Sequence, residues 1–124
     1  MATRRKPQKV YISYARSDAP KIERILAKLA ALGLVKPSDE VVSDKDLEPK
    51  HGALREGVRR QIQSASKVVV VWTAASAASQ WVNYEIGLAD AFGKSIIPVV
   101  RRSDLPSLPL LLQELQAVVV EDDV

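Results

Sequence analysis

The sequence contains no cysteine and only one histidine, His51. Without thiols it can form neither a disulfide framework nor a cysteine-based metal centre, and one imidazole is too few for a histidine cluster. We therefore expect a fold that is held together by its apolar core, with no metal site.

The sequence also lacks any long apolar run. Its longest apolar stretches fall well short of the ~18–20 residues that a membrane helix needs, and residues 1–6 lead into no hydrophobic signal core. A cytoplasmic protein without a membrane partner is the expectation.

Neither sign of charge is in large excess. The 18 Lys and Arg residues against 15 Asp and Glu residues give a net charge of +3, with an isoelectric point near 9.3. Much of the excess lies in Arg4, Arg5 and Lys6, within a basic tail over residues 1–8. Because no basic strand interleaved with aromatics follows, we do not expect nucleic-acid binding.

The length and composition are those of one globular domain, which we place at residues 9–124. The chain has 124 residues, 47% hydrophobic and 27% charged. At this size roughly two thirds of the unfolded surface can be buried, so the chain is expected to fold by itself.

Apolar, β-branched segments alternate with segments of helical periodicity. This alternation predicts an α/β fold of about five strands in a mostly parallel sheet, with helices on both faces. The strands are expected at residues 9–13, 40–43, 67–72, 95–100 and 117–120. The continuous run at 67–72 is typical of a central strand, while Pro98 shifts its own strand toward a sheet end or edge.

Helix boundaries are predicted from capping residues. Asp18 is expected to cap a first helix that stops at Gly33, and Ser79 to cap a third helix that ends at Gly93. The first helix has an apolar stripe of Ile22, Ile25, Leu26, Leu29 and Leu32, and the second buries Leu54, Val58, Ile62 and Ala65. A short helical segment is expected near residues 110–115.

Trp81 and Glu85 are the candidate functional pair. Positions i and i+4 of a helix share a face, so the indole and the carboxylate can line one pocket that suits a planar base and a ribose. Each also has a plain structural explanation, because the helix dipole favours Glu in the first turns and Trp commonly packs near helix starts.

The carboxyl ends of parallel strands meet at one edge of the sheet. Three segments should therefore meet there: residues 14–18, residues 44–52, and residues 73–79 with the helix that carries Trp81 and Glu85. We expect the functional pocket at this edge.

Four motifs in this order resemble the Toll/interleukin-1 receptor-like (TIR) domain family. They are Tyr-Ile-Ser-Tyr-Ala-Arg-Ser-Asp at 11–18, the acidic stretch at 44–47 followed by Gly52, Ser-Gln-Trp-Val-Asn-Tyr-Glu at 79–85, and Ile-Pro-Val at 97–99. The resemblance covers about residues 9–120 and implies a flavodoxin-like three-layer fold.

The segment with Trp81 and Glu85 looks most like the TIR domains that cleave NAD, in animal axon-degeneration factors, plant immune receptors and bacterial antiphage systems. The resemblance implies an NAD+ glycohydrolase in immune or antiphage signalling, with NAD+ as substrate and no further cofactor. It assigns catalysis to Glu85 and substrate binding to Tyr14, Arg16, Ser79 and Trp81. The products would be nicotinamide and either ADP-ribose or a cyclic form of it.

The loop at residues 44–52 corresponds to the segment that joins neighbouring domains in this family. Asp44, Asp46, Leu47 and Gly52 are the residues assigned to it, and the implied partners are other TIR domains, in a homo-oligomer or filament. The same composition fits a mobile surface connection, and the two aspartates fit loop-shaping hydrogen bonds better than metal ligation.

Two departures from the family pattern leave a second interpretation open. Val82 stands where many members have cysteine, and the second strand has Val41 and Val42 where an aromatic is common. The alternative is a TIR scaffold that acts through TIR–TIR contacts without chemistry. Receiver and flavodoxin proteins fit less well, because strand 67–72 does not end in Asp and no glycine follows the first strand.

Overall fold

The computed structural model describes residues 6–44 and 53–121. Within these ranges strands and helices alternate along the chain, and the 3-10 helices η1 and η3 occur between them. The elements are β1 Lys9–Ser13, η1 Arg16–Lys21, α1 Ile22–Ala31, β2 Glu40–Val42, α2 Ala53–Ser64, β3 Lys67–Trp72, α3 Ala74–Ala77, α4 Gln80–Ala91, β4 Ser95–Arg101, η3 Arg102–Ser107, α5 Leu110–Gln113 and β5 Val118–Val120.

The five strands form one sheet in the order β2-β1-β3-β4-β5, and every pairing is parallel. The central position predicted for residues 67–72 is confirmed, since β3 pairs with β1 on one side and β4 on the other. Its valines are at most 2% exposed, because a central parallel strand is covered on both faces. The sheet is wholly parallel where a mostly parallel one was expected.

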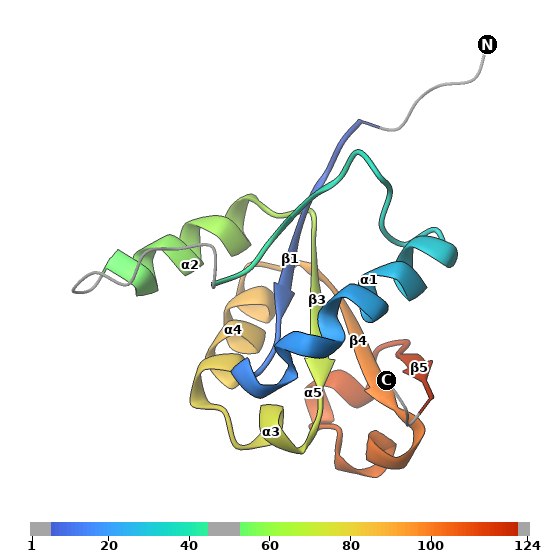
Figure 1. Ribbon diagram of the computed structural model, residues 1–124. Helices are drawn as coiled ribbons and strands as arrows, with labels where there is room; N and C mark the ends of the chain where they lie inside the picture. The colour runs from blue at the N-terminus through green and yellow to red at the C-terminus, as the bar shows by residue number, and fades with distance from the viewer. Residues whose placement is uncertain (1–5, 45–52, 122–124) are drawn as a thin grey trace.

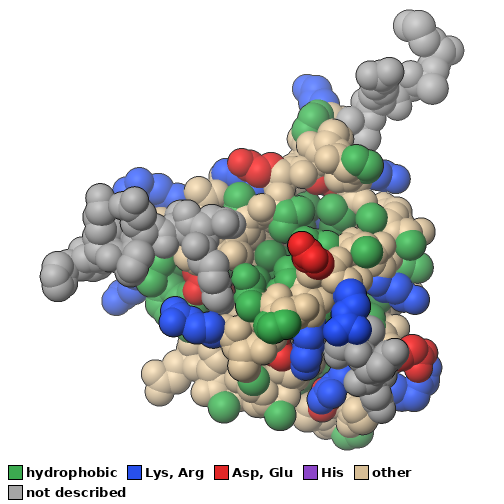
Figure 2. Space-filling model, in the orientation of Figure 1, with side chains coloured by type: hydrophobic (Ala, Val, Ile, Leu, Met, Phe, Trp, Pro, Cys, Tyr) green, Lys and Arg blue, Asp and Glu red, His purple; other side chains and the backbone are tan. Residues whose placement is uncertain are grey.

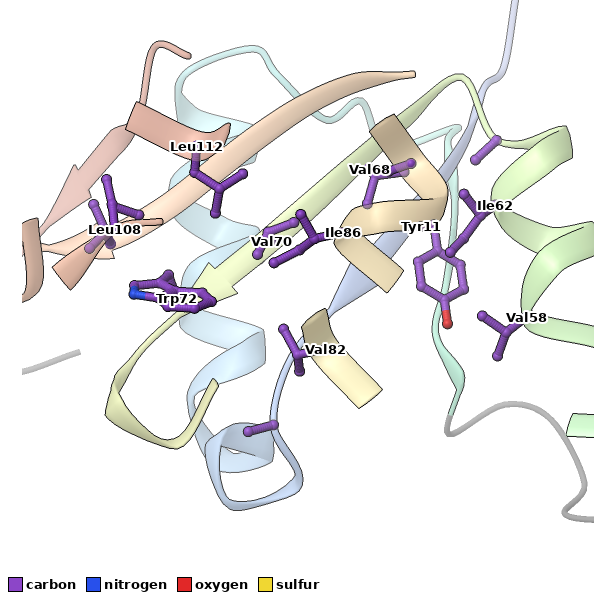
Figure 3. Close-up of a cluster of buried hydrophobic side chains, with 14 residues drawn as sticks. Tyr11, Val58, Ile62, Val68, Val70, Trp72, Val82, Ile86, Leu108 and Leu112 are labelled. Carbon is purple, nitrogen blue, oxygen red and sulfur yellow. The ribbon is translucent and has the colours of Figure 1, made fainter. Parts of the chain in front are cut away.

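Helices cover both faces of the sheet, which confirms the three-layer α/β fold (Figure 1). Successive side chains of a strand point to opposite faces. Val68 and Val70 of β3 pack in the core that includes residues of α2, α4 and α5, part of which Figure 3 shows. Val69 and Val71 pack in a second core with residues of α1.

The predicted ends of two helices are confirmed. Gly33 follows α1 and Gly93 follows α4, with φ of 75° and 67°, the left-handed conformation that glycine adopts readily after a helix. At the other end of α4, the Ser79 hydroxyl oxygen accepts a hydrogen bond from the Val82 N–H at 3.1 Å. Ser79 is therefore the N-cap that the sequence predicts.

Two expectations for the first helix are wrong. Asp18 is not a helix cap but lies within η1, where it is buried and accepts a hydrogen bond from the Thr73 hydroxyl at 2.6 Å. Its short side chain is used to join two loops, and no side chain caps α1. Leu32 does not belong to the buried stripe, because α1 ends at Ala31 and leaves Leu32 53% exposed.

The interpretation of Pro98 needs correction as well. Pro98 is buried inside β4, opposite Val70 of β3, and β4 is not an edge strand because β5 lies beyond it. The pairing with β5 begins at Val99, one residue past the proline. The sheet thus tolerates the imino acid just before the β4–β5 ladder starts.

A short helix, α3, lies between β3 and α4 where the sequence predicts only a loop. Thr73 and Ser76 form a capping box, in which each side chain accepts a hydrogen bond from the other residue's backbone N–H. The reciprocal bonds supply partners for helix-start N–H groups, which explains how a segment of four residues, mostly alanine, holds a helical turn.

The surface in Figure 2 bears Lys and Arg side chains scattered among apolar and acidic ones. Within residues 6–44 and 53–121, no helix is long and apolar enough to cross a membrane.

No finding tests the expectation that the protein does not bind nucleic acid, and this expectation remains a prediction.

Candidate functional site

A pocket of about 220 Å³ lies at the predicted edge of the sheet, where β1 ends and α4 begins. Its lining combines two aromatic side chains, one cationic, one acidic and one hydroxyl side chain with two apolar ones. Among the described residues, the lining consists of Tyr14, Ala15, Arg16, Asp44, Leu54, Ser79 and Trp81. The structure thus brings together Tyr14, Arg16, Ser79 and Trp81, the four residues that the sequence assigns to substrate binding.

Glu85 lies below this pocket rather than in its described lining. It is 0% exposed, on the turn of α4 that follows Trp81. Four residues of helix advance about 6 Å along the axis. Trp81 and Glu85, which were expected to share a pocket, therefore lie at different distances from the protein surface. Trp81 lines the pocket, and the carboxylate is one turn deeper in the protein.

Two hydroxyl groups of β1 hold the Glu85 carboxylate. The Ser13 hydroxyl donates to Oε1 at 2.7 Å, and the Tyr11 hydroxyl donates to Oε2. All three side chains are 0% exposed. A carboxylate that is removed from water needs such hydrogen bonds, because burying an uncompensated charge is very unfavourable.

Sequence reasoning missed Tyr11 and Ser13 as functional candidates. Positions i and i+2 of a strand point to the same face, so two hydroxyls spaced this way within the apolar strand β1 are a readable signal. They indicate a buried polar group opposite that face. Here this group is Glu85.

Trp81 packs against a neighbouring ring and also lines the pocket. Its ring centroid lies 5.3 Å from that of Tyr84, with 31° between the ring planes. The indole N–H is buried and has no hydrogen-bond partner in the described part of the chain. Trp81 thus packs on α4 and also borders the pocket, and its stacking on a base remains a prediction.

The remaining predicted site residues have different surroundings. Tyr14 is 9% exposed, while Arg16, the first residue of η1, is exposed. Asp44 is half-buried and lines the pocket. Three residues of the predicted assembly loop, Asp46, Leu47 and Gly52, lie outside the described residues.

A buried polar network fixes the loop after β1 to the end of β3. Asp18 accepts the Thr73 hydroxyl hydrogen bond and forms an ion pair with Lys21 at 3.1 Å. The Ser76 hydroxyl donates to the Val71 carbonyl at 2.6 Å. Because Asp18 closely follows Tyr14 and Arg16, this network restrains the loop that carries them.

A larger hollow than this pocket lies elsewhere among the described residues. It has a volume of about 720 Å³ and lies at the amino ends of β3, β4 and β5, where its lining includes Leu32, Lys28 and Lys67. Ligands of parallel α/β sheets bind beyond the carboxyl ends of the strands, so we take the smaller pocket as the candidate site. In the described ranges, no group of three His, Cys, Asp or Glu residues could hold a metal ion.

A family model described as "TIR domain" matches residues 10–123. Among solved structures, the TIR domain of the Toll-related receptor TRR-2 from Hydra magnipapillata is similar, with a TM-score of 0.70 and 17% identity over 92% of this chain and 85% of that one. No curated protein matches the sequence.

Two further structures share the fold. One is the CMP N-glycosidase BcmB from Clostridium botulinum, with a TM-score of 0.63 and 15% identity over 94% of this chain and 91% of that one. The other is the TIR domains of the activated Roq1 resistosome, which recognises the pathogen effector XopQ, with a TM-score of 0.60 and 18% identity over 81% of this chain and 61% of that one.

Proposed function

The chain belongs to the TIR domain family, and on that premise we propose that it is an NAD+ glycohydrolase that breaks the bond between nicotinamide and ribose. The observation that carries the proposal is the buried Glu85 carboxylate, hydrogen-bonded on both oxygens and one helical turn from Trp81 in the pocket lining. A buried carboxylate held beside a pocket is the kind of group that functional sites contain.

The reaction needs a negative charge more than it needs an acid. When the C1′–N bond breaks, its electron pair moves to the pyridinium nitrogen, and nicotinamide leaves as a neutral molecule. The ribose is left as an oxocarbenium-like cation. Water then attacks C1′ and loses a proton, which gives ADP-ribose, or an adenine nitrogen of the same molecule attacks and gives a cyclic form.

Glu85 is the group proposed to stabilise that cation. One carboxylate at about 4 Å from the developing charge contributes up to roughly 4 kcal/mol at an effective dielectric near 20. Hydrogen bonds from the ribose hydroxyls to the same carboxylate would orient the sugar, as they do in glycosidases. Both effects require the substrate to reach down from the pocket to the level of Glu85.

The residues around the pocket suit the rest of the substrate. Tyr14 and Trp81 offer aromatic surface for a base, Ser79 offers a hydroxyl, and the exposed guanidinium of Arg16 can pair with a diphosphate. The similar structure from Clostridium botulinum is named as an N-glycosidase of a nucleotide, which supports this class of substrate for the fold.

We further propose that the enzyme works in an assembly of TIR domains. Pockets for drug-sized ligands are typically about 300–1,000 Å³, and the pocket that the described residues form, about 220 Å³, is smaller than a dinucleotide requires. A neighbouring copy, joined through the segment at residues 44–52, would supply the remaining surface. The TIR domains of the Roq1 resistosome support a role in immune signalling, with defence against phage as the bacterial counterpart.

Nicotinamide release from NAD+ by the purified protein tests the activity. We expect release by the wild type and a loss of at least about a hundredfold in Glu85→Gln, because the amide keeps the size of the side chain but removes its charge. Glu85→Ala should be equally inactive. Thermal unfolding of both variants separates loss of chemistry from loss of fold.

The competing function is a TIR scaffold that binds other TIR domains without chemistry. The absence of an aromatic at Val41 and Val42 of β2 favours it. If no nicotinamide appears at high protein concentration, even in a crowded solution that promotes assembly, the scaffold is the better description and the glycohydrolase proposal is wrong.

A further inference from the structure

The two oxygens of Glu85 are held by two different hydroxyl groups from the same strand. Oε2 accepts from Tyr11, in the middle of β1, and Oε1 accepts from Ser13, its last residue. Each carboxylate oxygen therefore has its own hydroxyl donor: Tyr11 lies deeper in the protein, and Ser13 lies nearer the pocket.

The Tyr11 hydroxyl is fixed in place. Its ring is 0% exposed and belongs to the core with Val58 and Ile62 of α2, beside which it lies in Figure 3. A phenol is rigid, and its oxygen moves only when the ring moves. In a core packed at the density of a crystal, that movement requires neighbouring side chains to move as well.

The Ser13 hydroxyl is much less constrained. It is carried on one rotatable bond and can turn to another acceptor without moving the backbone. Ser13 is followed directly by Tyr14 and Ala15, which line the pocket. A ligand that enters the pocket thus approaches Glu85 from the side of Ser13.

We propose that Tyr11 is a positioning residue that holds Oε2 throughout the reaction, and that Ser13 is an exchangeable partner that gives Oε1 up to a ribose hydroxyl of the substrate. This inference rests on the glycohydrolase function proposed above. The exchange replaces one hydroxyl donor by another, so the carboxylate keeps a hydrogen bond on each oxygen. The net change in free energy is small provided that the displaced Ser13 hydroxyl donates in turn to an oxygen of the same ribose.

The two β1 residues should therefore affect NAD+ cleavage in different ways. Tyr11→Phe leaves the ring in place but removes its hydrogen bond to Oε2, and we expect kcat to fall by roughly 10- to 100-fold, as for one lost hydrogen bond to a charged group, with KM nearly unchanged. Ser13→Ala removes a competitor for Oε1. Its kcat should stay within a few-fold of wild type while KM falls by roughly 2- to 10-fold.

Steady-state kinetics of NAD+ cleavage measure this split between kcat and KM. Ser66→Ala serves as the matched control, since Ser66 is exposed at the amino end of β3, away from the site. A Tyr11→Phe variant with wild-type kcat, or a Ser13→Ala variant that loses kcat as severely as Tyr11→Phe, overturns the assignment. If the wild type releases no nicotinamide, the proposed function itself fails, which is a distinct result.

Proton NMR of the wild-type protein tests the same assignment without any substitution in β1. Buried, hydrogen-bonded hydroxyl protons exchange slowly with water, and those of Tyr11 and Ser13 are identified by their change in Glu85→Gln. On titration with carba-NAD+, an uncleavable analogue, the Tyr11 signal should persist and the Ser13 signal should shift or disappear. Loss of the Tyr11 signal with retention of the Ser13 signal reverses the two roles and contradicts the proposal.

Discussion

A charged side chain in the interior reduces the stability of a fold unless its hydrogen bonds compensate. The penalty for removing a carboxylate from water is several kcal/mol even after relaxation, and Glu85 is 0% exposed. Tyr11 and Ser13 offset part of it. An apolar residue at position 85 would pack there without this penalty, and the glycohydrolase function proposed above would give the carboxylate a role that accounts for it.

The role of Trp81 in substrate binding can be tested by substituting this one side chain. If it stacks on a base of NAD+, Trp81→Ala should raise KM by roughly 5- to 100-fold, the range for one base–aromatic stack. Trp81→Phe keeps an aromatic face and should stay within about fivefold of wild type. Steady-state kinetics measure both values.

The outcome distinguishes stacking from packing, because Trp81 also contacts Tyr84. Equal KM values for the alanine and phenylalanine variants, together with a lower melting temperature for the alanine variant, would assign Trp81 to packing alone. The indole N–H, which has no partner within the described residues, plays no part in this comparison.

Strands and helices were the most predictable part of the molecule. Continuous apolar runs such as Lys67–Trp72 and the capping signals at Ser79 and Gly93 are local, and local chemistry decides them. The loop partners of Asp18 were not predictable in this way. Thr73, which is 55 residues away in the sequence, competes for the carboxylate that would otherwise cap a helix.

In the candidate site, too, the local features were predictable and the long-range contacts were not. The spacing of Trp81 and Glu85 and their place on α4 follow from helical periodicity. That the carboxylate turns toward β1, and not into the pocket, depends on how α4 packs on the sheet, which no local pattern records. The one sequence signal for this orientation is the pair of hydroxyl side chains at alternate positions of β1, Tyr11 and Ser13.

Two glycines in and after α4 allow a paired prediction about the stability of the fold. Apart from its chain neighbours and the nearby backbone of its own helix, a β-carbon at either Gly87 or Gly93 would meet no atom within 4 Å, but Gly93 has a φ of 67°. Gly87→Ala should stabilise the fold by up to about 1 kcal/mol through helix propensity. Gly93→Ala should destabilise it by roughly 1–2 kcal/mol through left-handed backbone strain.

Urea unfolding of the two variants and the wild type measures the difference. Because neither new methyl group meets a neighbour, the opposite signs would report backbone conformation alone. Equal effects on the free energy of unfolding would show that the helix end is not held in the left-handed conformation in solution.

The pocket that the described residues form, about 220 Å³, is smaller than the proposed substrate requires, and we propose that assembly completes it. If neighbouring copies complete the site, nicotinamide release per molecule should rise with protein concentration and level off once assembly is complete. A dilution series of the wild type, followed in parallel by light scattering, tests this. A rate per molecule that is constant across the series, with no change in particle size, would mean that one copy is sufficient.

The carboxylate and its two hydroxyl partners lie 72 and 74 residues apart in the sequence. A ribosome makes β1 first and α4 much later, so a nascent or prematurely terminated chain lacks one half of the arrangement. Under the glycohydrolase function proposed above, such a fragment lacks part of the site and cannot cleave NAD+. The proposed activity thus becomes possible only after translation has passed α4.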